Sequence, residues 1–126
     1  MHALVVDDSR TMRAMLARML RDIDFAVQEA GHGKEALQLL EVQHRTQPFA
    51  LVLVDWNMPE MNGYDFVRRV RADDAYRHVR LMMVTTETEM GQVAKALEAG
   101  ADEYAMKPVT REVILEKLAI LGLAVP

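Results

Sequence analysis

Short apolar runs alternate with amphipathic stretches along the chain. Three of these runs are nearly continuous and rich in Val and Leu: Ala3 to Val6, Phe49 to Val54 and Leu81 to Val84. Continuous runs of this length are typical of strands that are buried on both faces. Phe25 to Val27 and Ala101 to Met106 are weaker strand candidates. The pattern therefore predicts five strands.

Apolar residues at helical spacing fill the stretches that follow these runs. The sets are Met12, Met15, Leu16, Met19 and Leu20; Ala36, Leu37 and Leu40; Phe66, Val67 and Val70; Met90, Val93, Ala94 and Leu97; and Ile114, Leu118 and Leu121. The first set is the clearest, because its spacing is i, i+3, i+4, i+7 and i+8. Strands that alternate with helices predict an α/β fold with a doubly wound, five-stranded parallel sheet, since right-handed crossovers place helices on both faces.

Residues that begin and end helices agree with this alternation. Asp8 or Ser9 is expected to cap the first helix and Thr110 the last, and Gly100 to end the fourth in the left-handed conformation. The last helical pattern runs nearly to Pro126, and the chain contains no repeat, low-complexity stretch or Pro/Gly-rich linker. We therefore expect one domain over residues 1–126.

Composition narrows the possible functions. The 126 residues are 51% hydrophobic and contain no cysteine, which excludes a disulfide framework, a thiolate metal site and a cysteine nucleophile. A net charge of −4 disfavours general binding to nucleic acid or to an anionic membrane, because both need clustered positive charge. No apolar run approaches the roughly 20 residues that a membrane helix needs, and no signal peptide is evident. The expected location is the cytoplasm.

Polar residues with chemical potential stand where the predicted strands end. Asp7 and Asp8 follow the first strand, Asp55 the third, Thr85 the fourth and Lys107 the fifth. Because parallel strands end at one edge of a sheet, and ligands bind there, these groups should converge. Clustered carboxylates with oxygen-only ligands favour Mg²⁺, whereas the four histidines show no zinc-ligand spacing. The inferred chemistry is phosphoryl transfer to a carboxylate.

The sequence resembles a response-regulator receiver domain along its whole length. The resemblance rests on these segments in order: Asp7-Asp8, Glu29 to Leu37, Asp55-Trp56-Asn57-Met58-Pro59, Val84-Thr85-Thr86-Glu87, Tyr104 and Lys107-Pro108. It is closest to the single-domain, CheY-like chemotaxis regulators. The resemblance implies a flavodoxin-like (βα)₅ fold with strand order 2-1-3-4-5.

The resemblance also implies a role for each acidic residue. Asp55 would accept the phosphoryl group from a histidine kinase. Asp8 and Asp55 would bind Mg²⁺ through their carboxylates, the backbone carbonyl of Asn57 would be a third protein ligand, and Asp7 would act largely through water. Lys107 would contact the phosphoryl group.

A switch follows from the same resemblance. The hydroxyl of Thr85 would move onto a phosphoryl oxygen, and the ring of Tyr104 would turn inward into the vacated space. The changed face of the fourth helix, fifth strand and fifth helix would then bind a downstream protein. The implied protein is a stand-alone two-component regulator of chemotaxis or a related phosphorelay, a signalling switch more than an enzyme, and a monomer or weak phosphorylation-dependent dimer.

Two other functions stay open on the sequence alone. An aspartyl-phosphate phosphohydrolase uses a similar acidic cluster, but it needs a second acid two residues after the nucleophile, where this chain has Asn57. A phosphorylation-independent binding module would not need the complete acid, Thr and Lys set. A nucleotide or flavin binder is disfavoured, because Asp7 and Asp8 stand where a phosphate-binding loop would be.

Three positions depart from the family pattern. Thr86 stands where the family has a small residue, and its bulk could hinder approach to the phosphoryl group. Glu89 and Met90 stand where regulators of flagellar motors carry lysine.

Trp56 is expected at a partly exposed rim beside the site.

Overall fold

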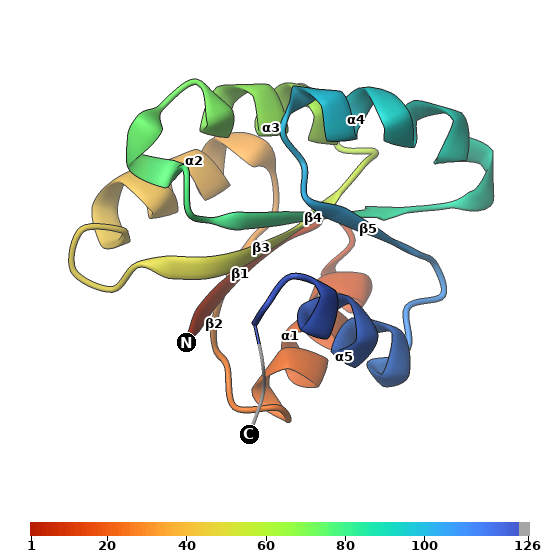
Figure 1. The fold of residues 1–126 in the computed structure, drawn as a ribbon, viewed down its shortest axis with the longest axis horizontal. Coiled ribbons are helices and arrows are strands. Elements are labelled where there is room, and N and C mark those ends of the chain that lie inside the picture. Colours follow the sequence, from red (N-terminus) through yellow and green to blue (C-terminus); the bar gives the residue numbers. More distant parts are fainter. Residues whose placement is uncertain (124–126) are drawn as a thin grey trace.

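The computed structural model describes residues 1–123, without the side chain of residue 87. Along these residues, strands and α-helices alternate, with two short 3₁₀ helices, η1 and η2 (Figure 1). The elements are β1 His2–Val6, α1 Arg10–Arg21, β2 Ala26–Ala30, α2 Gly33–Gln43, β3 Phe49–Asp55, α3 Gly63–Arg71, η1 Asp74–Tyr76, β4 Arg80–Thr85, η2 Glu87–Gln92, α4 Val93–Ala99, β5 Glu103–Met106 and α5 Arg111–Ile120. The predicted extension of the last helical pattern toward Pro126 includes residues 124–126, which lie outside the described residues.

The five strands form one parallel sheet in the order β2-β1-β3-β4-β5. Helices α2, α3 and α4 cover one face of the sheet, and α1 and α5 cover the other (Figure 1). This arrangement confirms the predicted doubly wound α/β fold and its strand order. It also places the carboxyl ends of all five strands at one edge.

The core is divided into two layers by the sheet. Leu4 and Val6 of β1 contact the cluster that includes residues of α2, α3 and α4. Ala3 and Val5 contact the cluster that includes residues of α1 and α5. Successive residues of a strand point to opposite faces, so a strand covered on both sides must be apolar throughout. This explains the continuous apolar runs of the sequence.

The two weaker strand candidates have different bounds from those expected. β2 covers Ala26–Ala30 and is an edge strand, and its exposed and partly buried residues alternate. An edge strand with a solvated face tolerates polar residues such as Gln28 and Glu29, which hid its extent. β5 is shorter than predicted and covers only Glu103–Met106.

One residue of the stripe predicted for the first helix is not buried. Leu16, Ala17 and Leu20 are buried, whereas the side chain of Met15 is 44% exposed. The prediction that Met15 belongs to the buried stripe is therefore wrong. The small Ala17 lies against the sheet instead, and spacing of apolar residues alone did not distinguish these two neighbouring sides of the helix.

The residues that cap the helices are largely as predicted. Ser9, not Asp8, caps α1 by accepting a hydrogen bond from the Met12 N–H, and Thr110 caps α5. Gly100 ends α4 with a φ of 123°. None of the described helices is long and apolar enough to cross a membrane.

Candidate functional site

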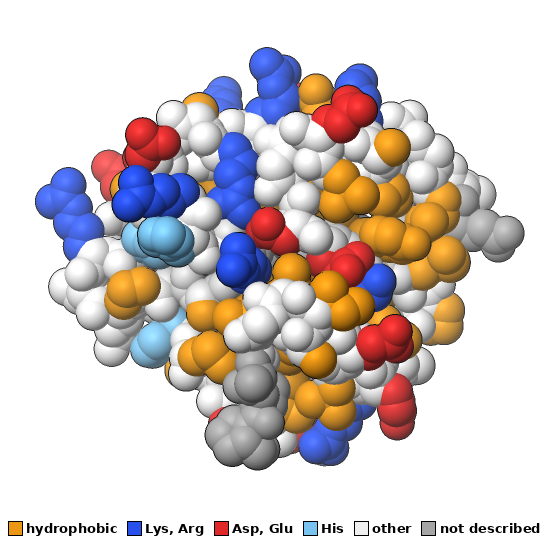
Figure 2. All heavy atoms as spheres, viewed as in Figure 1, with side chains coloured by type: hydrophobic (Ala, Val, Ile, Leu, Met, Phe, Trp, Pro, Cys, Tyr) orange, Lys and Arg blue, Asp and Glu red, His pale blue; other side chains and the backbone are white. Residues whose placement is uncertain are grey.

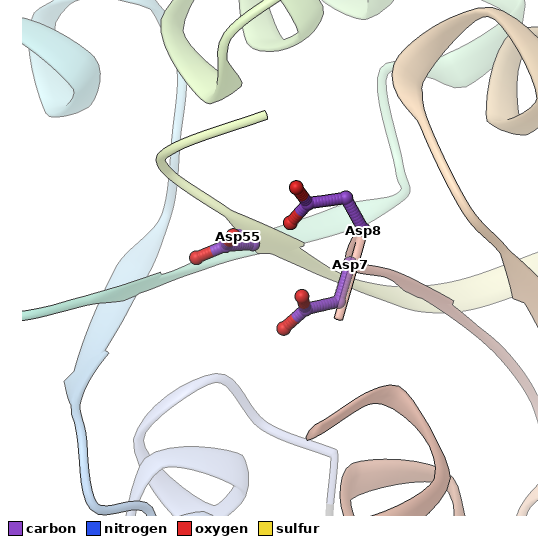
Figure 3. A group of neighbouring side chains, drawn as sticks. All are labelled: Asp7, Asp8 and Asp55. Carbon is purple, nitrogen blue, oxygen red and sulfur yellow. The ribbon is translucent and has the colours of Figure 1, made fainter. Parts of the chain in front are cut away.

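Three aspartates from two neighbouring strands meet at the carboxyl-terminal edge of the sheet. Asp7 and Asp8 follow β1, and Asp55 is the last residue of β3 (Figure 3). The two strands are hydrogen-bonded neighbours with Val6 opposite Val54, so the residues that follow them are adjacent. Each aspartate offers a carboxylate oxygen within 4.8 Å of the other two. The predicted convergence of the carboxylates is therefore present in the fold.

The three carboxylates differ sharply in exposure to water. Asp7 is completely buried and Asp55 is only 4% exposed, whereas Asp8 is exposed. Burial raises the pKa of both Asp7 and Asp55, because an ionised carboxylate loses its hydration there. The negative charge of the neighbouring aspartates raises the pKa of each further.

One oxygen of Asp7 lacks a hydrogen-bond donor. Its Oδ1 accepts a hydrogen bond of 2.8 Å from the backbone N–H of Ser9. Its Oδ2 is buried and has no partner within the described part of the chain. A buried carboxylate oxygen without a donor is costly, and a cation can satisfy it. Together with the oxygen-only donor set, this fits a cluster able to hold a hard divalent metal ion.

Lys107 brings a positive charge to the cluster from the end of β5. Its Nζ donates a hydrogen bond of 2.9 Å to Oδ1 of Asp55, and the peptide bond that follows Lys107 is cis. Burial alone would lower the pKa of Lys107, but the hydrogen bond and the charge of Asp55 outweigh that effect and raise it. Lys107 is thus held as an ammonium beside the Asp55 carboxylate.

Thr85 contacts Lys107 through the backbone, and Tyr104 lies on the strand that ends just before Lys107. Thr85 is completely buried at the end of β4, and its carbonyl accepts a hydrogen bond of 2.7 Å from the backbone N–H of Lys107. The Thr85 hydroxyl lies 3.3 Å from the carbonyl oxygen of Thr86. Tyr104 is half-buried on β5, with the Nζ of Lys117 at 4.6 Å from its ring centroid.

The loop after β3 contains the remaining predicted site residue. Asn57 lies two residues beyond Asp55 and is exposed. Between them, Trp56 is half-buried and its backbone N–H donates to the carbonyl of Val84 on β4. The proposed metal-ligand role of the Asn57 carbonyl stays a prediction.

Two residues of this site were missed by the sequence analysis. Arg13 of α1 donates a hydrogen bond of 2.9 Å to the backbone carbonyl of Asp7 and forms a 3.3 Å ion pair with Glu29. Glu89 of η2 accepts hydrogen bonds from Thr86, the residue that follows β4. In the sequence, Arg13 is one basic residue of an amphipathic helix, and Glu89 stood out only as a departure from lysine. No spacing signal points to the contact of Arg13, whereas Thr86 and Glu89 have the Thr-x-x-Glu spacing of a capping box, a signal that the sequence analysis did not use.

Comparison with known proteins identifies the same family along nearly the entire chain. Residues 3–119 match the model of the response regulator receiver domain. The chain is 43% identical to the chemotaxis protein CheY1 of Helicobacter pylori over 122 residues, which cover 96% of each chain.

Solved structures show the same likeness. The chemotaxis protein CheY4 of Vibrio cholerae superimposes with a TM-score of 0.83 at 32% identity, covering 95% of this chain and 97% of that one. The receiver domain of a sensor histidine kinase from Pseudomonas aeruginosa superimposes with a TM-score of 0.83 at 25% identity, covering 96% and 97%. The latter structure has a magnesium ion coordinated in its active-site cleft.

Proposed function

The chain belongs to the response regulator receiver domain family, whose members are signalling switches, and from that premise we propose that it is a stand-alone regulator in chemotaxis. It accepts a phosphoryl group from a histidine kinase on Asp55. The observation that carries this proposal is the 2.9 Å contact between Asp55 and Lys107 beside two further aspartates. The chemotaxis role is supported by relatives of the same length.

Phosphoryl transfer requires a nucleophile and compensation of charge. An oxygen of the Asp55 carboxylate forms a bond to phosphorus while the bond between phosphorus and the donor nitrogen breaks, and the departing imidazole takes up a proton. Negative charge accumulates on the phosphoryl oxygens during this step. Lys107 is placed to offset it, since its ammonium is already hydrogen-bonded to the nucleophile. Hydrolysis reverses the state, because attack of water on phosphorus restores the Asp55 carboxylate.

We assign Mg²⁺ as the metal of this site. The carboxylates of Asp8 and Asp55 and the backbone carbonyl of Asn57 would hold it, with Asp7 acting largely through water. Bound Mg²⁺ supplies charge neutralisation and orientation for the phosphoryl oxygens. The buried, unpartnered Oδ2 of Asp7 supports this assignment, as does the magnesium in the related receiver domain from Pseudomonas aeruginosa.

The signal reaches a partner through Thr85 and Tyr104. The Thr85 hydroxyl moves to a phosphoryl oxygen, and the Tyr104 ring turns inward behind it. The partner surface comprises α4, β5 and α5, where the side chains of Leu97 and Met106 are 40% and 41% exposed. Figure 2 shows apolar side chains gathered on the side of the molecule where these elements lie.

The proposed setting of this switch is the cytoplasm, with residues 1–126 forming one domain. The protein acts as a monomer or as a weak phosphorylation-dependent dimer. Its partners are a histidine kinase and a downstream protein.

Phosphorylation by a small donor tests the proposed function. We expect incubation with acetyl phosphate and Mg²⁺ to add one phosphoryl group, measured by intact mass. The addition should require Mg²⁺ and disappear in Asp55→Asn. Unchanged labelling of Asp55→Asn would place the acceptor elsewhere and contradict the assignment.

A further inference from the structure

Glu89 forms a capping box with Thr86, the residue between β4 and η2. Its Oε1 accepts a hydrogen bond of 2.9 Å from the backbone N–H of Thr86 and another of 3.0 Å from the Thr86 hydroxyl. In return, the backbone N–H of Glu89 donates to the Thr86 carbonyl at 3.0 Å. Three hydrogen bonds therefore join these two residues, and they fix the conformation of the turn directly beside Thr85.

The same carboxylate lies beside the hydroxyl of Thr85. The Thr85 Oγ1 is 3.5 Å from Oε1 of Glu89 and 3.3 Å from the Thr86 carbonyl oxygen. A hydroxyl carries a single hydrogen, so it donates one strong hydrogen bond at a time. A phosphoryl group on Asp55 would compete with these two acceptors for that hydrogen. The Thr85 hydroxyl therefore cannot donate its hydrogen to the phosphoryl group and to Glu89 or Thr86 at the same time.

Electrostatic repulsion also disfavours the resting position of Glu89 once Asp55 is phosphorylated. The carboxylate of Glu89 is close enough to Lys107 for its charge to contribute to the raised pKa of that ammonium. Phosphorylation converts the Asp55 carboxylate that Lys107 contacts into an acyl phosphate, which adds about one negative charge and three exposed phosphoryl oxygens. Repulsion between the phosphoryl group and Glu89 favours departure of the Glu89 side chain.

On the basis of the proposed function, we propose that Glu89 is a positioning residue that holds Thr85 and Thr86 in the resting arrangement and is displaced when Asp55 is phosphorylated. Its departure removes two of the three hydrogen bonds that join Glu89 to Thr86 in the first turn of η2. The first turn of η2, which leads into α4, is then free to change. Glu89 thereby contributes to the free energy difference between the resting and the phosphorylated conformations. It also connects the site to the partner surface.

Beryllofluoride, a phosphoryl mimic, tests this role in the intact protein saturated with Mg²⁺. We expect Glu89→Ala to bind beryllofluoride about fivefold more tightly than the wild type, because no resting contact must be broken. Glu89→Gln keeps the acceptor oxygen without the charge and should lie between the two. Glu98→Ala removes a carboxylate from the exposed surface of α4 and should match the wild type. Trp56, the only tryptophan, reports binding by its fluorescence.

An NMR measurement separates positioning from a general loss of stability. The amide resonance of Thr86 should shift in resting Glu89→Ala toward its position in wild type saturated with beryllofluoride. In the wild type, beryllofluoride should move this resonance because the contact with Glu89 breaks. Glu98→Ala should leave the resonance unchanged.

The outcomes distinguish this inference from the proposed function. If the wild type binds beryllofluoride but Glu89→Ala binds it no more tightly and the Thr86 resonance stays at its resting position, the role of Glu89 is wrong and the receiver function stands. If the wild type binds no beryllofluoride with Mg²⁺, the proposed function fails and the role of Glu89 fails with it.

Discussion

The folded protein buries some of the carboxyl groups at this site, and burial disfavours their ionised form. Asp7 is completely buried, its Oδ2 has no hydrogen-bond partner among the described residues, and Asp55 and Asp8 lie close by. The pKa of Asp7 is raised chiefly by burial. A group whose pKa is raised on folding stabilises the fold only while it is protonated, below the pKa of the unfolded chain near about 3.9. That contribution is lost as pH rises through the raised pKa.

Asp7→Asn should therefore stabilise the metal-free protein at pH 7. The amide has the shape of the carboxyl group without its charge, so we expect the free energy of unfolding to rise by about 1 kcal/mol. The difference from wild type should shrink as pH falls through the raised pKa of Asp7, because the Asp7 carboxyl group then becomes protonated and uncharged. Urea unfolding at several pH values in the presence of a chelator measures both effects.

Glu116→Gln is the matched control for that experiment, because it removes the same charge from an exposed position on α5. It should leave the stability at pH 7 within about 0.5 kcal/mol of wild type. A metal-free Asp7→Asn protein that is less stable than wild type at pH 7 would show that the Asp7 carboxylate is satisfied in a way that contradicts its unpartnered oxygen.

Lys107 and Thr85 should separate the chemical step from the switch. Lys107→Ala removes the ammonium that contacts Asp55, so labelling by acetyl phosphate should slow by at least about tenfold. Thr85→Ala removes a hydroxyl whose contacts are with Thr86 and Glu89, so labelling of Asp55 should continue near the wild-type rate. Intact mass as a function of time measures both rates. Equal slowing in the two variants would refute this division of roles.

At the scale of helices and strands, Gly63 allows the start of α3 to approach the end of β3 closely. Gly63 begins α3, and its N–H donates a 2.8 Å hydrogen bond to the carbonyl of Trp56. A Cβ at this position would meet the Met83 side chain and would lie 3.0 Å from the carbonyl oxygen of Asp55. The start of α3 thus lies directly against the end of the strand that carries Asp55, the proposed phosphoacceptor.

Gly63→Ala should disturb stability and the site together. We expect a loss of about 1 to 3 kcal/mol in the free energy of unfolding, because the added methyl group forces α3 from β3. Labelling of Asp55 should also slow, since in-line transfer tolerates little displacement. Gly91→Ala in η2 adds a methyl group in open space and should affect neither property. Chemical unfolding and intact mass test the pair, and wild-type values in Gly63→Ala would contradict the close approach.

The sequence predicted the strands through their continuous apolar runs, and therefore the edge at which Asp7, Asp55 and Lys107 meet. It did not predict the different burial of Asp7 and Asp8. These neighbours are chemically identical, and which of them is buried depends on how the surrounding helices and loops pack. The contact between Glu89 and Thr86 was also missed, although the two residues have the Thr-x-x-Glu spacing of a capping box. The strand order came from the resemblance, since alternation of strands and helices alone permits more than one order.

Cation binding at the acidic cluster should change the stability of the whole molecule, because the cluster spans two central strands. Asp7 and Asp8 follow β1, Asp55 ends β3, and these strands lie side by side within the sheet. The native arrangement brings the three carboxylates together, whereas the unfolded chain separates the first two from the third by more than 40 residues of sequence. A cation that binds this cluster must therefore stabilise the entire fold.

Mg²⁺ should raise the melting temperature of the intact chain in a saturable way. At a concentration of 100 times Kd, binding to the native state alone contributes about 2.7 kcal/mol, which corresponds to a rise on the order of 10 °C for a domain of this size. Thermal unfolding followed by circular dichroism measures the rise, and NaCl at equal ionic strength controls for general screening. Asp8→Ala should keep the metal-free fold, because Asp8 is exposed, yet lose most of the response to Mg²⁺. An equal rise in Asp8→Ala would mean that the metal binds outside the acidic cluster, because a ligand of the ion cannot be removed without weakening its binding.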